Sequence, residues 1–182
     1  MSFIRRNARG FSLTELMLIV TIAGTIMAIA LPVTTELTAS TKLSEAARLV
    51  EREFQDARLR AVSSNRSLRV RTNCPAVGFV RSVEVLGTAA DAAADRCLQS
   101  AYPFPADTDV MTRPNYDGPV RFIPNAATAT TATIEFSPDG TARLVDAAGV
   151  AQPMAAEQTI TVTRQSKSRT VMVNGAGKVQ IQ

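Results

Sequence analysis

The feature that most constrains this chain is a long uncharged run close to its start. Residues 16–35 carry no charged side chain and are rich in Leu, Ile, Met and Ala. A helix from Phe11 to Leu31 would rise about 30 Å at ~1.5 Å per residue, which matches the thickness of a bilayer core. Residues 1–10, before this helix, carry no acid and three arginines: Arg5, Arg6 and Arg9. This asymmetry predicts a single-pass protein whose amino terminus stays in the cytoplasm and whose remainder lies across the membrane.

The length of the apolar run and the charge before it are typical of three kinds of segment. These are a secretory signal cut near Ala28–Ala30, a plain single-span anchor, and a leader cut on the cytoplasmic side so that the apolar segment stays on the mature protein. Glu15 favours the third, because a carboxylate in such a segment costs roughly 2.5–3.5 kcal/mol on insertion scales and the first two gain nothing from it. Cleavage after Gly10 would expose a positive amine on Phe11, about 6 Å along the axis from Glu15. In a packed fibre, that carboxylate and the amine of an adjoining subunit would set the axial register.

Residues 9–16, Arg-Gly-Phe-Ser-Leu-Thr-Glu-Leu, resemble the prepilin-peptidase signature of type IV pilins and type II secretion pseudopilins. That pattern is a Gly, a Phe, a small hydroxyl residue, a Leu, any residue and a Glu, followed by an apolar stretch. The resemblance implies cleavage after Gly10 and N-methylation of Phe11 by the same membrane peptidase. It implies a role for Glu15 in assembly, other pilins or pseudopilins as partners, and a place in a bacterial inner membrane and its pilus or pseudopilus.

A second helical pattern follows the apolar run. Pro32 lies between the two, and a proline inside a helix predicts a kink or a local melt. Beyond it, apolar residues recur at steps of three and four, which predicts one apolar stripe on a helix: Leu43, Ala46, Ala47, Val50, Phe54, Ala57 and Ala61. We therefore predict one helix from Phe11 to about Ser64, with the stripe packed on a sheet.

After Asn65 the pattern changes to short β-like runs separated by turn signals. The predicted strands are Leu68–Arg71, Gly78–Leu86, Val120–Ile123, Thr133–Phe136, Ala142–Val145, Thr159–Thr163, Thr170–Val173 and Lys178–Ile181. Thr88–Asp95 and Asn125–Ala132 are predicted loops. The expected fold is α+β, a long amino-terminal helix packed against an antiparallel sheet. The expected parts are a leader (1–10), the helix (11–64) and a periplasmic head domain (65–182).

One segment of the predicted helix and three segments of the head are similar to the GspH/FimT class of minor pilins and pseudopilins. They are residues 48–61, 134–140, 159–162 and 169–179. Together with the leader, the resemblance covers most of the chain except roughly residues 85–130. It implies a structural subunit of a type IV pilus or of a type II secretion pseudopilus.

Cys74 and Cys97 are the only cysteines. In an oxidising periplasm they can form a disulfide, and two unrelated thiols are the alternative. Closing that loop of about 24 residues would stabilise the head by roughly 3 kcal/mol in the chain-entropy model. A redox-active site is not expected, because the spacing is not C-x-x-C.

No catalytic residue, metal site or cofactor is predicted. The chain has no histidine, which removes the usual general base and the commonest metal ligand. Two cysteines alone cannot supply the four ligands of a structural zinc site. A membrane-anchored enzyme is therefore the least favoured hypothesis. The net charge of +4 also carries little information, because the three arginines before the apolar run account for most of it.

Some members of the class bind DNA in natural competence through a Gly-Arg-x-Arg element near the carboxy terminus. The matching residues here are Gly177-Lys178-Val179-Gln180, which keep one of the two basic positions. Residues 158–182 nevertheless contain four basic side chains and no acid: Arg164, Lys167, Arg169 and Lys178. Such a cluster can attract phosphates. DNA binding is therefore the second hypothesis for function, and a solvated basic face is the alternative.

Overall fold

The computed structural model describes residues 12–104 and 116–182, with only the backbone described at Leu31, Pro32 and Val33. Helix α1 runs from Leu13 to Ser64, close to the predicted span. The backbone stays helical through Pro32, which excludes the local melt, while the kink that was its alternative stays a prediction. A proline removes one backbone hydrogen bond, and the turns on either side keep theirs. The chain divides into two compact units, residues 1–39 and residues 40–182, and α1 contributes to both.

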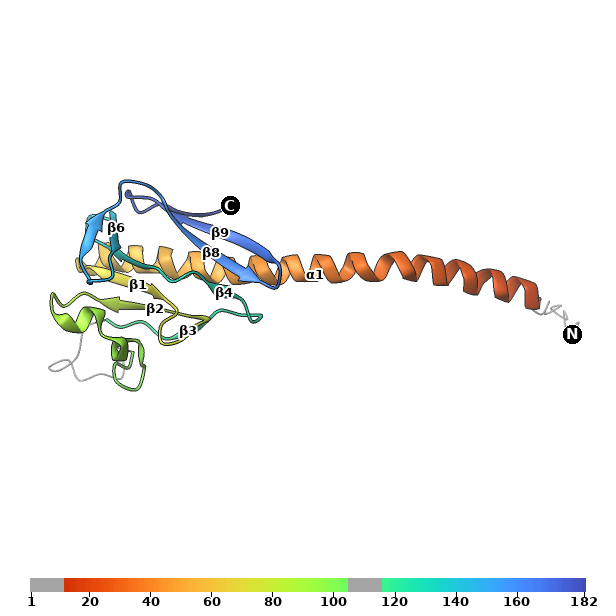
Figure 1. Cartoon of the computed structure of the whole chain (residues 1–182), viewed down its shortest axis with the longest axis horizontal. Coiled ribbons are helices and arrows are strands. Elements are labelled where there is room, and N and C mark those ends of the chain that lie inside the picture. Colours follow the sequence, from red (N-terminus) through yellow and green to blue (C-terminus); the bar gives the residue numbers. More distant parts are fainter. Residues whose placement is uncertain (1–11, 105–115) are drawn as a thin grey trace, which may run out of the picture. The chain divides into compact units, whose positions relative to one another are not determined.

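The strands in the described residues form two antiparallel sheets (Figure 1). The six-stranded sheet has the order β3-β2-β1-β5-β6-β7, and the four-stranded sheet has the order β10-β9-β8-β4. Their bounds are β1 (Leu68–Thr72), β2 (Phe79–Glu84), β3 (Arg121–Phe122), β4 (Thr128–Ala129), β5 (Thr133–Phe136), β6 (Ala142–Val145), β7 (Ala151–Pro153), β8 (Gln158–Arg164), β9 (Lys167–Val173) and β10 (Val179–Ile181).

The α+β class and the eight predicted strands are confirmed, but two details differ. The strands divide between two sheets, where one sheet was expected. Strands β4 and β7 were not predicted, and β4 lies inside the predicted loop Asn125–Ala132. The predicted loop Thr88–Asp95 contains one short 3₁₀ turn, η1 (Ala89–Ala92), and the start of a second, η2 (Ala94–Cys97).

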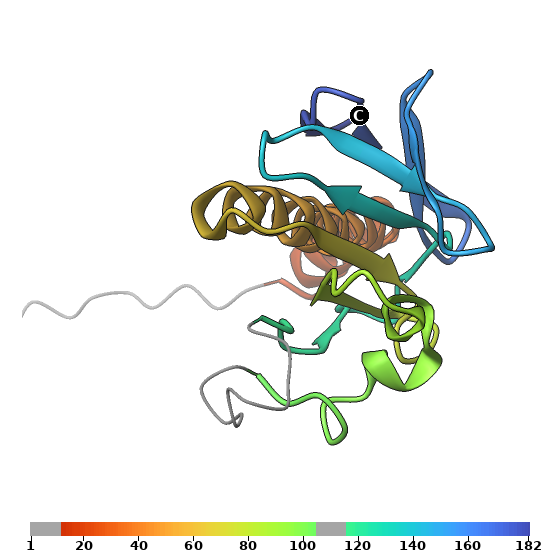
Figure 2. The same ribbon diagram turned by 90° about the vertical axis from the view of Figure 1, so that its left-hand side faces the viewer.

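One hydrophobic core joins the second half of α1 to both sheets (Figures 1 and 2). Every residue of the predicted stripe from Leu43 to Ala61 is at most 3% exposed. Phe54 lies at the centre of this packing, and its ring meets Phe136 of β5 edge to face with centroids 6.4 Å apart. Ile160 and Val171 of the four-stranded sheet are also fully buried in this core. The helix therefore stabilises the head as a part of its core.

Arg58 of α1 ties together one turn from each sheet. Its Nε donates to the carbonyl oxygen of Gly140 at 3.1 Å, and its Nη2 donates to that of Ala176 at 3.3 Å. Both turns, residues 137–140 and 174–177, were predicted from their Gly, Asn and Pro residues. A cationic side chain that bonds two carbonyls fixes the distance between the turns.

Gly177 allows the two turns and Arg58 to lie this close together, so its replacement should lower the stability of the fold. Its φ is +74°, and a Cβ there would lie 2.1 Å from the Gly140 carbonyl oxygen and 2.8 Å from Nε of Arg58. We expect Gly177→Ala to lower the free energy of unfolding by at least about 2 kcal/mol, through the left-handed backbone and the clash together. Urea unfolding of the full-length chain in detergent measures this. Tyrosine fluorescence can report it, since the chain has two tyrosines and no tryptophan.

Gly87 is the matched control for Gly177→Ala. It has the same φ of +74°, but a Cβ there would meet nothing within 4 Å. Gly87→Ala should therefore lower the free energy of unfolding by about 1 kcal/mol, the cost of a left-handed backbone alone. Equal losses for the two variants would contradict the role given to the close approach at Gly177.

Candidate functional site

The first half of α1 presents an apolar surface that no other described part of the chain covers. Within Leu13–Ser64 the structure has one helical segment long and apolar enough to cross a membrane, judged by length and composition. Its large hydrophobic side chains are 50–75% exposed: Leu13, Leu16, Met17, Leu18, Ile19, Val20, Ile22, Ile26, Met27 and Ile29. A continuous apolar surface of this kind requires lipid or other apolar helices around it.

Glu15 lies in the first turn of this helix. Its backbone N–H donates to the carbonyl oxygen of Ser12 at 3.1 Å, and its side chain is exposed. The amino-terminal end of a helix carries partial positive charge, which favours a carboxylate there. Gly10 and Phe11, the predicted cleavage and methylation residues, lie outside the described residues. The pairing of Glu15 with a neighbour's amine therefore stays a prediction.

Three of the four residues of the predicted basic cluster lie together. Arg164 ends β8, Lys167 begins β9, and the two are paired across the hairpin, with Arg169 two residues further along β9. Lys178 lies beyond the far end of β9, because β10 begins opposite Val173. Six residues of strand, about 20 Å at ~3.3 Å per residue, separate that end from Lys167. The four side chains do not form one patch.

The side chain of Arg164 also forms a hydrogen bond within the head. Its Nε donates to the carbonyl oxygen of Asn125 at 2.9 Å. The side-chain amide of Asn125 in turn donates to the carbonyl oxygen of Lys42 at 3.2 Å and to Oε2 of Glu45 at 2.9 Å. Arg164 thus helps to hold the chain at Asn125 against helix α1, which is a structural role. DNA binding by this cluster stays a prediction.

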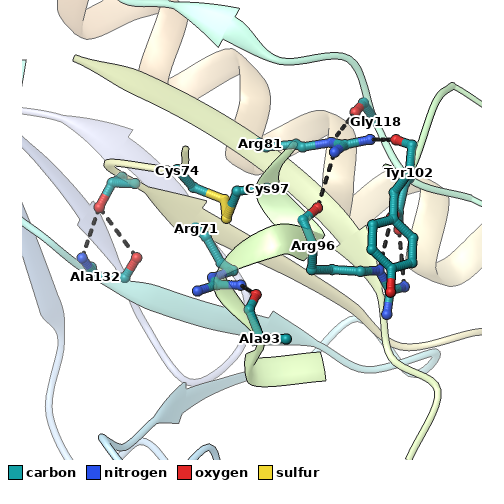
Figure 3. Close-up of a disulfide and its surroundings, with 11 residues drawn as sticks. Arg71, Cys74, Arg81, Ala93, Arg96, Cys97, Tyr102, Gly118 and Ala132 are labelled. Carbon is teal, nitrogen blue, oxygen red and sulfur yellow. Dashed lines mark hydrogen bonds and ion pairs between the residues drawn. A yellow bond between two sulfur atoms is a disulfide. The ribbon is translucent and has the colours of Figure 1, made fainter. Parts of the chain in front are cut away.

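Cys74 and Cys97 form a disulfide, and both are buried (Figure 3). The bridge closes a segment that contains η1 and η2. Figure 1 shows this segment on the side of β1 and β2 that faces away from α1. The disulfide therefore fastens an elaborated loop to the outer face of the six-stranded sheet.

Two fully buried arginines hold the same loop, and the sequence analysis did not identify them (Figure 3). Arg96 pairs with Asp117 through contacts of 2.8 and 3.0 Å and donates to the carbonyl oxygen of Glu84 at 2.6 Å. Arg81 donates to three backbone carbonyl oxygens, those of Gly118, Arg96 and Tyr102. One available signal was a charged residue in the middle of the apolar strand run Gly78–Leu86. These contacts stabilise the loop and suggest no catalytic chemistry.

A groove of about 610 Å³ runs along the charged face of α1 beside β3. Here Glu53 and Arg121 form an ion pair at 3.4 Å. Burial raises the pKa of the Glu53 carboxyl, and the charge of Arg121 opposes that shift. In the part of the chain that the structure describes, no group of three or more His, Cys, Asp or Glu side chains could hold a metal ion. The groove is a mixed-charge surface, lined by both basic and acidic side chains.

Comparison with known proteins relates these features to a family. The sequence profile of the type II transport protein GspH matches residues 46–177, and that of the prokaryotic N-terminal methylation motif matches residues 5–31. A crystal structure of the type IV minor pilin FimU from Pseudomonas aeruginosa superposes with a TM-score of 0.50 at 19% identity, covering 80% of this chain and 92% of that one. A second crystal form gives 0.45 at 19% identity, with 77% and 92% covered. At this identity the likeness shows the fold alone. No curated protein sequence matches significantly.

Proposed function

Since the chain belongs to the family of the type II transport protein GspH, we propose that it is a minor pilin or pseudopilin that helps to assemble a type IV pilus or a type II secretion pseudopilus. The observation that carries the proposal is the uncovered apolar segment of α1 from Leu13 to Ile29. It has Glu15 in its first turn and falls within the match to the N-terminal methylation motif. An enzyme has no use for this combination, whereas a fibre subunit needs it.

Assembly would proceed through the apolar helix. Before assembly, residues 11–31 would lie in the bacterial inner membrane, with the amino terminus in the cytoplasm and the head in the periplasm, as the three leader arginines predict. The prepilin peptidase would cut after Gly10 and methylate Phe11. Packing of these helices against those of other subunits would then supply association energy through van der Waals contacts. Outside the membrane, the same packing would keep their apolar surface away from water.

The head would determine which neighbours the subunit accepts. Its disulfide and the buried Arg96–Asp117 pair hold η1 and η2 against the six-stranded sheet. The mixed-charge groove beside Arg121 gives a surface whose complement must carry matching charges. Specificity from the head and affinity from the helix together suit a subunit that occupies one defined position.

The intact mass and amino-terminal sequence of the mature chain test this proposal. We expect the purified wild-type protein to begin at a methylated Phe11. Gly10→Val should block cleavage, so that the precursor retains residues 1–10 and is excluded from the fibre. Gly24→Ala is the control, because a Cβ at Gly24 meets nothing within 4 Å, and it should be processed normally. A wild-type protein that begins at Met1 or beyond Ala28 would overturn the proposal.

A further inference from the structure

A small cavity on the outer face of the six-stranded sheet is not used by the proposed function. Its volume is about 190 Å³, and β1, β5, β6, η1 and the turn between β6 and β7 contribute its lining. The charged groups in it are Arg69, Arg71, Asp91 and Asp146. Two cations and two anions make the formal charge of the lining zero. The hydrogen bonds of these four side chains differ, however, and they leave one arginine with unused donors.

Both carboxylates are already bonded to backbone groups. Asp91 accepts hydrogen bonds from the N–H groups of residues 86–88 at 2.7–3.3 Å and forms an ion pair with Arg96 at 3.5 Å. Asp146 accepts from the N–H groups of Ala148 and Val150, both at 2.9 Å. Each carboxylate is therefore satisfied within its own turn.

The two arginines differ from each other in how many of their hydrogen-bond donors are used. Arg69 forms a buried pair with Glu135 at 2.9 Å and donates to the carbonyl oxygen of Gly149 at 3.0 Å. Arg71 is half-buried and donates once, from Nη1 to the carbonyl oxygen of Ala93 at 2.8 Å (Figure 3). Among residues 12–104 and 116–182, no carboxylate forms an ion pair with it. A guanidinium has five N–H donors, so most of its capacity remains.

The surroundings of Arg71 favour a negative group beside it. Burial lowers the pKa of its guanidinium, and the nearby charges of Arg69 and Arg96 lower it further. Charges withdrawn from water are normally paired, because desolvation penalises them. Arg71 is thus a half-buried cation with unused donors beside a cavity, and the two carboxylates that line this cavity, Asp91 and Asp146, are bonded elsewhere.

We propose that this cavity is a binding site for an oxyanion, held by the planar fork of Arg71. Carboxylate and phosphate groups match the guanidinium geometry and accept two parallel hydrogen bonds from it. The volume equals that of roughly six waters at ~30 Å³ each, which is ample for either group. The anion would also screen Arg71 from the two neighbouring arginines. This site does not depend on the assembly role.

Unfolding of the full-length chain in detergent, with acetate or phosphate replacing chloride at constant ionic strength and pH 7, tests the site. For a dissociation constant of about 1 mM, 50 mM of the bound anion should lower the unfolding equilibrium constant roughly fiftyfold. Arg71→Gln should abolish this response. Arg143→Gln is the control for net charge, because Arg143 is exposed on β6 and does not line the cavity, and it should respond like the wild type.

The two probes also distinguish the source of the oxyanion. A response to acetate indicates a carboxylate, such as a side chain of another protein, and a response to phosphate alone indicates a phosphate group. Should Arg71→Gln fail to fold, Arg71→Lys decides, because it keeps the charge but loses the fork and should respond several-fold less. A wild type that responds to neither anion, or variants at Arg71 that respond as strongly as the wild type, would overturn the proposal.

Discussion

Glu15→Gln should lower incorporation of the chain into its fibre about a hundredfold or more, while membrane insertion and leader cleavage continue. In an apolar bundle the glutamine would leave the amine of the adjoining Phe11 uncompensated. Removing one partner of a buried ion pair costs about 3–5 kcal/mol, and each 1.4 kcal/mol changes an equilibrium about tenfold. The measurement is the ratio of this subunit in sheared fibres to that in the inner membrane, by quantitative immunoblotting.

Glu51→Gln provides the control for this effect. Glu51 is an acid on the same helix, and it accepts a hydrogen bond from the side-chain amide of Gln55 at 3.3 Å. Since it lies in the unit of residues 40–182 and outside the apolar segment, its loss should leave incorporation within about twofold of the wild type, as for a surface polar contact. If Glu15→Gln entered the fibre as readily as Glu51→Gln, Glu15 would have no role in register.

The helix and most strands were predictable because their sequences carry a clear period. The stripe from Leu43 to Ala61 repeats at three and four residues, and its members are buried as that period requires. Two strands have the predicted bounds, β5 (Thr133–Phe136) and β6 (Ala142–Val145). Strand β5 has alternating polar and apolar residues, and the Pro-Asp-Gly turn between the two strands marks where β5 ends and β6 begins. Local pattern sufficed wherever one face of an element enters the core.

The division into two sheets was not predictable from local pattern. Strand β4 consists of Thr128 and Ala129, which are too few for any alternation, and it exists because Thr128 pairs with Thr163. Strand β7 ends in Pro153, a residue that weakens a strand signal and is tolerated here at a sheet edge. Both strands depend on partners distant in the sequence.

The candidate sites show the same limit. The basic residues near the carboxy terminus are close in sequence, but the length of β9 separates Lys178 from Lys167. In the opposite sense, Arg96 and Asp117 are 21 residues apart and form a bidentate buried pair. Charged residues usually indicate surface, so nothing in the sequence alone indicated that this pair lies inside.

That buried pair gives the second large effect. Arg96→Met should lower the free energy of unfolding by about 3–5 kcal/mol, because Asp117 would remain buried without its cation. Arg96 is 0% and Asp117 1% exposed, so water cannot replace the lost contacts in place. Urea unfolding of the full-length chain in detergent, followed by tyrosine fluorescence, measures the change. The double variant Arg96→Met/Asp117→Asn should recover part of it, since both charges are then removed.

Arg60→Met is the control, because the pair of Arg60 with Asp56 is exposed, whereas the pair of Arg96 with Asp117 is buried. Arg60 and Asp56 form an ion pair at the same N–O distance of 2.8 Å, but their side chains are 43% and 46% exposed. An exposed pair contributes about 0–1 kcal/mol, and the contact of Arg60 with the ring of Tyr116 adds about as much. The loss should therefore be well below that of Arg96→Met. Equal losses would mean that η1 and η2 are held by the disulfide and the backbone, and that the buried charges are incidental to the stability of this segment.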